Sequence, residues 1–306
     1  MLIWIYKLNS NMDTQGFIGN QKSVHYLSRI SDKGRVSHAY LFTGPEGVGK
    51  ATLALIFAAG LLGDTAGNLD KNPDLIRIRV PEGEKQIGIE AVREMQKSLS
   101  LYPFKAKHKV AIIEQAELLS PSAANSLLKT LEEPNETSVI ILIAADAGKI
   151  LPTINSRCQC LSFNPVYGQE IDSLLRSRGV SAAGDIADLA QGRPGLAIRL
   201  ADDPDLLGRM KQDKKTVLGL FDMGNFEKLE SASAVYDLEK EEAVEVLDGW
   251  IVALRAELLK GFEKGEGKRV KEMKEAIEKT ITVREDIIER NVNLKLSIEN
   301  LVLSFK

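Results

Sequence analysis

The sequence is poor in cysteine: its 306 residues include only Cys158 and Cys160, which stand two positions apart. A single such pair provides neither a disulfide framework nor the second pair that a zinc site requires, so we expect a reducing compartment, the cytoplasm. No apolar run reaches the roughly 20 residues of a membrane-spanning helix, so no membrane partner is expected. The net charge of −3 excludes a strongly basic, non-specific nucleic-acid binder, although a local basic surface is compatible with it.

What is present is the composition of a globular protein long enough for two or three domains. Up to about residue 165, short apolar runs alternate with segments of helical periodicity. The runs that predict strands are 39–42, 75–80, 109–113, 138–144 and 158–163, and the segments that predict helices are 17–34, 51–58, 89–101 and 120–133. Strands that alternate with helices in this way predict an α/β fold with a parallel sheet.

After Asn164-Pro165 the strand pattern stops. Three short helices are expected at 171–178, 184–191 and 195–201, and the rest of the chain is expected to be helical. Two apolar stripes, Val244 to Leu258 and Val270 to Ile281, flank a loop predicted at 261–267. The predicted division is a possible N-terminal extension (1–12), an α/β core (13–165), a small helical lid (166–205) and an all-helical domain (206–306).

The clearest motif is Gly44-Pro45-Glu46-Gly47-Val48-Gly49-Lys50, between a predicted strand and a predicted helix. Its spacing is that of a phosphate-binding loop, in which backbone N–H groups, the helix N-terminus and the lysine surround phosphates. Gly44, Gly47, Gly49 and Lys50 are therefore candidate nucleotide-binding residues, and Thr52 is a further candidate of this degenerate loop. The alternative is a glycine-rich strand–helix turn that binds nothing.

Three positions argue against ATP hydrolysis. The residue after the lysine should carry a hydroxyl that ligates Mg²⁺, but it is Ala51, and Thr52 lies about 100° further around the helix. After the third predicted strand, Glu114 is a weakly supported candidate for contact with a metal. Gln115 occupies the place of the acid that activates water. Ala145 stands where a polar residue would sense the γ-phosphate. We therefore expect a degenerate phosphate loop and no bound metal; for Glu114 the alternative is a loop carboxylate without a ligand.

Three longer segments carry a family resemblance: Ser37 to Pro45 (SHAYLFTGP), Ala124 to Pro134 (ANSLLKTLEEP) and Leu151 to Cys158 (LPTINSRC). Together they resemble subunits of the bacterial DNA polymerase III clamp loader, an AAA+ assembly. The resemblance covers residues 13–205 and, more loosely, Asn291 to Leu296. The degraded loop is similar to that of delta-prime-type subunits and differs from that of the ATP-hydrolysing gamma/tau type.

The resemblance implies an AAA+ phosphate-loop domain, a helical lid and a C-terminal collar that joins the five subunits of the clamp loader, a component of the DNA polymerase III holoenzyme. It implies a non-hydrolysing stator that helps to load the sliding clamp onto primed DNA in replication, with gamma/tau-type and delta subunits as partners. In the motif Ser156-Arg157-Cys158 it implies an arginine offered in trans to a neighbour's ATP. The alternative for Arg157 is a loop-end arginine in a local ion pair. The alternative function is an active DNA-dependent ATPase of the gamma/tau type; a small-molecule kinase is disfavoured because no acceptor site is evident.

Two departures from the family pattern matter. Many delta-prime proteins carry a four-cysteine zinc module, but residues 62–72 contain no cysteine, so we expect no zinc and a connector held by packing alone. Gly195 stands where active relatives place a second phosphate-sensing arginine, a role that Arg193 could partly take. No cofactor is expected to be required, and weak binding of ATP or ADP stays open.

Overall fold

The computed structural model describes residues 12–290 and 292–305, so the possible N-terminal extension up to residue 11 and Asn291 lie outside the described residues. The chain forms two compact units, one with residues up to 170 together with 192–195, the other with residues 171–191 and 196 onward. The predicted division into core, lid and collar stays a prediction.

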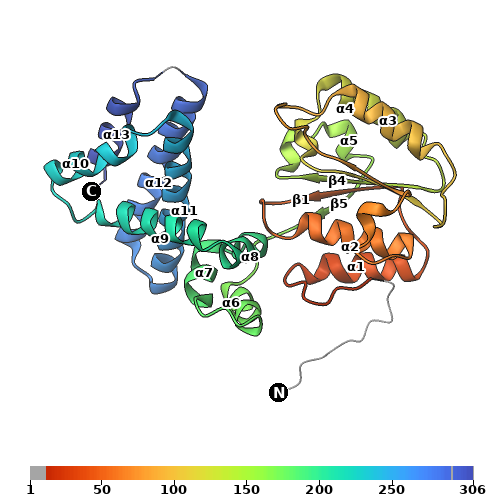
Figure 1. Cartoon of the computed structure of the whole chain (residues 1–306), viewed down its shortest axis with the longest axis horizontal. Helices are drawn as coiled ribbons and strands as arrows, with labels where there is room; N and C mark the ends of the chain where they lie inside the picture. Colours follow the sequence, from red (N-terminus) through yellow and green to blue (C-terminus); the bar gives the residue numbers. More distant parts are fainter. Residues whose placement is uncertain (1–11, 291, 306) are drawn as a thin grey trace. The chain divides into compact units, whose positions relative to one another are not determined.

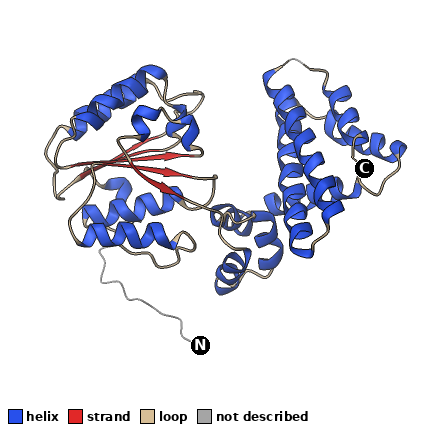
Figure 2. Cartoon of the chain, turned by 180° about the vertical axis from the view of Figure 1, so that it is seen from behind, coloured by secondary structure: helices blue, strands red, loops and turns tan. Residues whose placement is uncertain are grey.

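The first unit contains a five-stranded parallel sheet in the order β2-β3-β4-β1-β5. Figure 2 shows its strands in red between two layers of helices. The strands are β1 (Ala39–Thr43), β2 (Leu75–Ile78), β3 (Lys109–Ile113), β4 (Ser138–Ala144) and β5 (Gln159–Ser162). A strand is present in each of the five predicted runs, and the α/β fold with a parallel sheet is confirmed.

Helices cover both faces of this sheet, and this explains the uninterrupted apolar runs of its inner strands. Helices α1 (Gln21–Asp32) and α2 (Lys50–Leu62) lie on one face, and α3 (Ile89–Leu99), α4 (Pro121–Glu132) and the short α5 (Pro152–Asn155) lie on the other (Figure 1). Every residue of β1, β3 and β4 is buried, as parallel strands packed on both faces require.

The local sequence predicted the start of α4 correctly but not the end of β2. Helix α4 begins as predicted, with the Ser120 hydroxyl accepting a hydrogen bond from the Ala123 N–H at 3.2 Å and Pro121 at the first position. Strand β2 stops at Ile78, two residues before its predicted end, because Ile78 pairs with Ile113, the last residue of β3. As an edge strand, β2 has β3 as its one neighbour in this sheet, which an isolated run of residues does not reveal.

The connector after α2 corrects one expectation. Leu69 is buried there, but the Asp64 carboxylate also accepts hydrogen bonds from the Asn72 side chain at 2.9 Å and the Thr65 N–H at 2.8 Å. The prediction that packing alone holds this connector is wrong, because polar side chains close it as well. Within residues 12–290 and 292–305 no group of three His, Cys, Asp or Glu residues could hold a metal ion. The expectation of no zinc stays a prediction.

Helices make up the rest of the chain, in agreement with the sequence pattern. The three short helices are α6 (Gly168–Ser177), α7 (Ala183–Ala190) and α8 (Pro194–Asp202), and the longer ones are α9 (Pro204–Gly219), α10 (Asn225–Tyr236), α11 (Lys240–Lys264), α12 (Gly267–Glu289) and α13 (Leu294–Leu303). The buried core formed by α9 to α13 includes Trp250, and the Phe221 and Phe305 rings stack there with centroids 5.2 Å apart. None of the described helices is long and apolar enough to span a membrane.

The loop predicted at 261–267 is wrong. Helix α11 continues to Lys264, and only Gly265, with φ of 73°, and Glu266 separate it from α12. Gly261 serves helix packing instead of a turn, since a Cβ there would lie 3.1 Å from a methyl group of Val270. On α12, three lysines pair with glutamates one turn further along the helix, for example Lys271 with Glu275 at 4.0 Å.

Candidate nucleotide site and Arg157

The phosphate-type loop follows β1 and ends at α2, as its spacing predicts. Gly44 has φ of 139°, and a Cβ there would overlap the carbonyl oxygen of Phe163. Gly49 caps α2 in the left-handed region, with φ of 98°. Glycine is required at both places because other residues would clash or be strained.

Lys50 is turned onto its own loop. Its ammonium donates to the carbonyl oxygens of Gly44 and of Pro45, the latter at 2.7 Å, and the residue is buried. Burial lowers the pKa of Lys50, while the negative charges of Glu117 and Glu46 oppose that shift. A phosphate would have to compete with these two carbonyls for the lysine.

A cleft of about 500 Å³ lies beside the loop. It brings together most residues expected to form a degenerate nucleotide site, except Gly44. Its lining includes Gly47, Gly49, Lys50, Ala51, Thr52, Glu114, Gln115, Ala145 and Gly195. Its size is that of a small-molecule site, and the missing hydroxyl, acid and sensor positions all face it.

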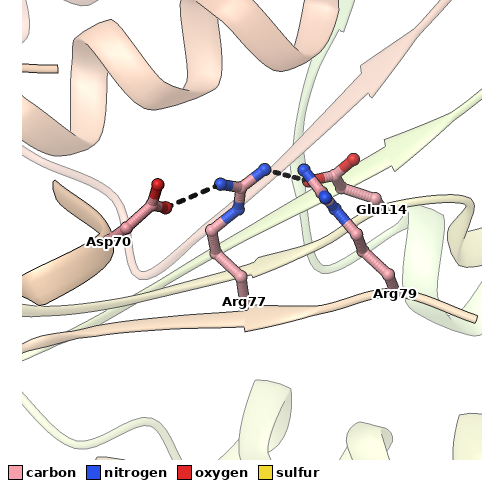
Figure 3. Close-up of polar contacts among 4 residues, drawn as sticks. All are labelled: Asp70, Arg77, Arg79 and Glu114. Atoms are coloured by element: carbon pink, nitrogen blue, oxygen red, sulfur yellow. Dashed lines mark hydrogen bonds and ion pairs between the residues drawn. The ribbon is translucent and has the colours of Figure 1, made fainter. Parts of the chain in front are cut away.

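Glu114 is held by two arginines that the sequence analysis did not single out. Figure 3 shows the chain of contacts: one carboxylate oxygen of Glu114 accepts from Arg77 and from Arg79, each at 2.8 Å, and Arg77 also binds Asp70 at 3.0 Å. Two guanidinium groups reduce the negative charge available to a divalent cation, so the geometry gives no support to metal binding by Glu114. The sequence did contain a signal for this pair. Arg77 in β2 and Arg79 just after it are two residues apart, and this spacing places both side chains on one face of an extended strand.

Glu117 also lines the cleft, beside Glu46 and Glu114, and sequence reasoning missed it. One of its carboxylate oxygens accepts from the N–H of Ala145 at 2.9 Å, and the other is buried and has no hydrogen-bond partner among residues 12–290 and 292–305. It follows Gln115, whose φ of 53° turns the chain after β3. Only the neighbouring positions of β3 and β4 in the sheet bring Glu117 to Ala145, so spacing along the chain gave no signal.

The segment 192–195 lies against the phosphate-type loop. The Gly195 N–H donates to the carbonyl oxygen of Gly47 at 2.8 Å, and a Cβ on Gly195 would lie 3.2 Å from that oxygen. The backbone contact therefore occupies the space in which a sensing side chain would start.

Arg157 lies between α5 and β5 and is partly exposed. Its Nη2 binds a carboxylate oxygen of Glu132 at 2.8 Å, and its Nη1 donates to the Thr153 carbonyl at 2.9 Å and lies 3.4 Å from the Ser156 hydroxyl. In the same motif, burial raises the pKa of Cys158 to about 12, with a smaller contribution from Cys160. Cys158 is therefore a neutral thiol, which is unsuited to act as a nucleophile at neutral pH.

The sheet separates Arg157 from the chain's own loop. In the parallel pair β1 and β5, Tyr40 lies opposite Gln159 and Thr43 opposite Ser162. Arg157 precedes the first of these pairs and the loop follows the last. At about 3.3 Å per residue, the strands hold the two at opposite edges, on the order of 10 Å or more apart. The structure thus brings most of the loop residues, though not Gly44, to one cleft, and Ser156, Arg157 and Cys158 do not line it.

Comparisons with known proteins agree with this architecture. Residues 19–167 match the family model described as "DNA polymerase III, delta subunit". The chain is 34% identical over 163 residues to DNA polymerase III subunit delta' of Bacillus subtilis, covering 49% of each chain. It is 32% identical over 184 residues to subunit tau of the same organism, covering 55% of this chain and 32% of tau. The chain therefore spans half or less of the length of these relatives.

A solved structure extends the likeness of fold. The DNA polymerase III gamma subunit-related protein of Thermotoga maritima superposes with a TM-score of 0.52 at 20% identity, over 90% of this chain and 97% of that protein. At this identity the likeness concerns the fold alone, a parallel sheet with flanking helices followed by further helices. Residues 19–167 of the chain are thus similar to the delta-type subunits of DNA polymerase III, delta' among them, and also to tau.

Proposed function

We propose that the chain is a non-hydrolysing stator subunit of a DNA polymerase III clamp loader. In this function it helps to load a sliding clamp onto primed DNA and supplies Arg157 in trans to ATP bound by a neighbouring subunit. Its partners are gamma/tau-type ATPase subunits and a delta subunit. The observation that carries the proposal is the separation across the sheet: because Arg157 and the chain's own loop lie at opposite edges, a phosphate that Arg157 contacts belongs to another chain.

The lack of hydrolysis rests on the cleft. Ala51 supplies no hydroxyl for Mg²⁺, the amide of Gln115 is no base for water, and Lys50 already binds two loop carbonyls. Weak binding of ATP or ADP is compatible with such a cleft, and no cofactor or zinc is required. The alternative is an active gamma/tau-type ATPase. The likeness to tau favours it, but the cleft lacks the hydroxyl and the water-activating acid that hydrolysis requires.

The proposed contribution of Arg157 follows from its chemistry. A guanidinium carries a permanent charge and planar N–H donors, which match phosphate oxygens and neutralise the charge that develops during phosphoryl transfer. Lysine keeps the charge but loses the planar arrangement. Arg157→Lys should therefore restore little of what Arg157→Ala loses.

The test is a complex reconstituted with gamma/tau-type and delta partners. Arg157→Ala should leave composition and ATP binding unchanged and lower clamp-stimulated ATP turnover roughly two- to tenfold, less than a full arginine finger because only one of several ATP sites is served. Arg93→Ala, an exposed arginine on α3, is the matched control. Equal turnover and clamp loading in wild type and Arg157→Ala would refute the proposal, and failure to assemble would make Arg157 an interface residue.

A further inference from the structure

Glu132 holds Arg157 in a defined orientation. It is the last residue of α4, and its carboxylate binds Nη2 of Arg157 at 2.8 Å. The Thr153 carbonyl in α5 and the hydroxyl of Ser156, the residue after α5, accept from Nη1. We propose that Glu132 is a positioning residue, which orients the Arg157 guanidinium for the phosphate of a neighbouring subunit. This inference rests on the proposed function.

The count of donors supports this assignment. A guanidinium has five N–H donors, and the contacts to Glu132, Thr153 and Ser156 use three of them. At most two N–H groups therefore stay available to a phosphate unless a contact breaks. Two donors suffice for a bidentate contact with phosphate oxygens. The remaining donors are thus enough for the proposed contact, and their direction is set by the three that are engaged.

The anchor of Glu132 is firm although its side chain is half-exposed. Leu127 and Leu131 of α4 are buried in the core under the sheet, and Pro134 follows two residues after the helix end. The carboxylate therefore projects from a fixed point. An arginine side chain has many rotamers, and fixing it before the phosphate arrives reduces the entropy lost when the contact forms.

Because the Arg157–Glu132 ion pair is partly exposed, an effect of Glu132 on the position of Arg157 can be distinguished from an effect on folding stability. The side chains of Arg157 and Glu132 are 35% and 51% exposed, and ion pairs this exposed contribute little to folding stability. Loss of Glu132 should therefore leave the fold and assembly intact. Glu133, the next residue, is an exposed carboxylate outside the contact and serves as the matched control.

The experiment uses the complete reconstituted complex with Glu132→Ala, Glu132→Gln, Glu133→Gln, Arg157→Ala and the double variant Glu132→Ala/Arg157→Ala. Glu132→Ala should lower kcat for ATP roughly two- to threefold at unchanged KM, because Arg157 acts in the transition state. Glu132→Gln should fall between it and wild type, since the amide keeps an acceptor but loses the charge. Glu133→Gln should match wild type. In the double variant, Glu132→Ala should add nothing to Arg157→Ala.

Several results would overturn the inference. Wild-type turnover in Glu132→Ala would remove the role, and effects that multiply in the double variant would show that Glu132 acts independently of Arg157. Faster turnover in Glu132→Ala would mean that the carboxylate restrains the arginine instead of presenting it. Failure of Glu132→Gln to assemble would make Glu132 an interface residue. If Arg157→Ala itself leaves ATP turnover at the wild-type value, the proposed function is refuted. If only Glu132→Ala does so, the positioning role alone is refuted.

Discussion

Asp213 on α9 gives a pH-dependent prediction for the helical unit. Its carboxylate packs so close to α11 that a Cβ on Gly249 would overlap it. Burial raises the pKa of Asp213 to about 6, although Arg209 one turn earlier opposes the shift. The folded unit therefore prefers a protonated Asp213. Asp213→Asn, which is neutral at every pH and of the same shape, should stabilise this unit at pH 7.

The magnitude follows from proton linkage. An unfolded aspartate has a pKa of about 4, so the folded state binds more protons than the unfolded state between about pH 4 and pH 6. Stability is thus complete below about pH 4, falls as the pH rises through this window, and stays reduced above it. A difference of about two pH units corresponds to at most about 3 kcal/mol at pH 7. Partial exposure of Asp213 makes about 1–2 kcal/mol the expected gain for Asp213→Asn.

The assay is urea unfolding followed by tryptophan fluorescence in a Trp4→Phe background, in which the signal comes from Trp250 in the core of the helical unit. The free energy of unfolding of Asp213→Asn minus that of the parent should be near zero at pH 4 and should grow to its full value by pH 7. Asp222→Asn, an exposed aspartate after the same helix, should show no such growth. A difference that is the same at pH 5 and pH 8 would refute the reasoning.

Two further predictions concern the first unit. Asp74 is fully buried and accepts from the N–H groups of Phe104, Lys105 and Ala106 at 2.7–3.3 Å, so Asp74→Asn should cost about 2–3 kcal/mol, seen as a lower Tm at pH 7. Burial acts to raise the pKa of Asp74, but these hydrogen bonds and Lys109 outweigh it and lower the pKa. The carboxylate's contribution should therefore be present above about pH 4 and disappear as the pH falls through the lowered pKa; a loss of Tm that is independent of pH would contradict this. The isolated chain should hydrolyse ATP no faster than Lys50→Ala, and turnover of about 1 s⁻¹ or more that Lys50→Ala abolishes would show an ordinary ATPase.

The sequence by itself determined the features that depend on neighbouring residues. The apolar runs of β1, β3 and β4, the Ser120-Pro121 helix start and the glycine spacing of the loop are local patterns, and each produces the element that it predicts. The motif around Arg157 also lies within one short segment, so its likeness to a family was visible before the fold was known.

Only the tertiary structure decided which distant side chains meet. Gly195 reaches Gly47, Glu117 reaches Ala145, and Glu132 reaches Arg157 through the order of strands and the length of α4. Gly261 is a second example. Its local sequence predicts a loop, but in the folded chain it lies inside a helix, where the lack of a side chain allows close packing against Val270. Hydrophobic periodicity fixes the type of an element, whereas its partners depend on the strand order and on packing that several elements create together.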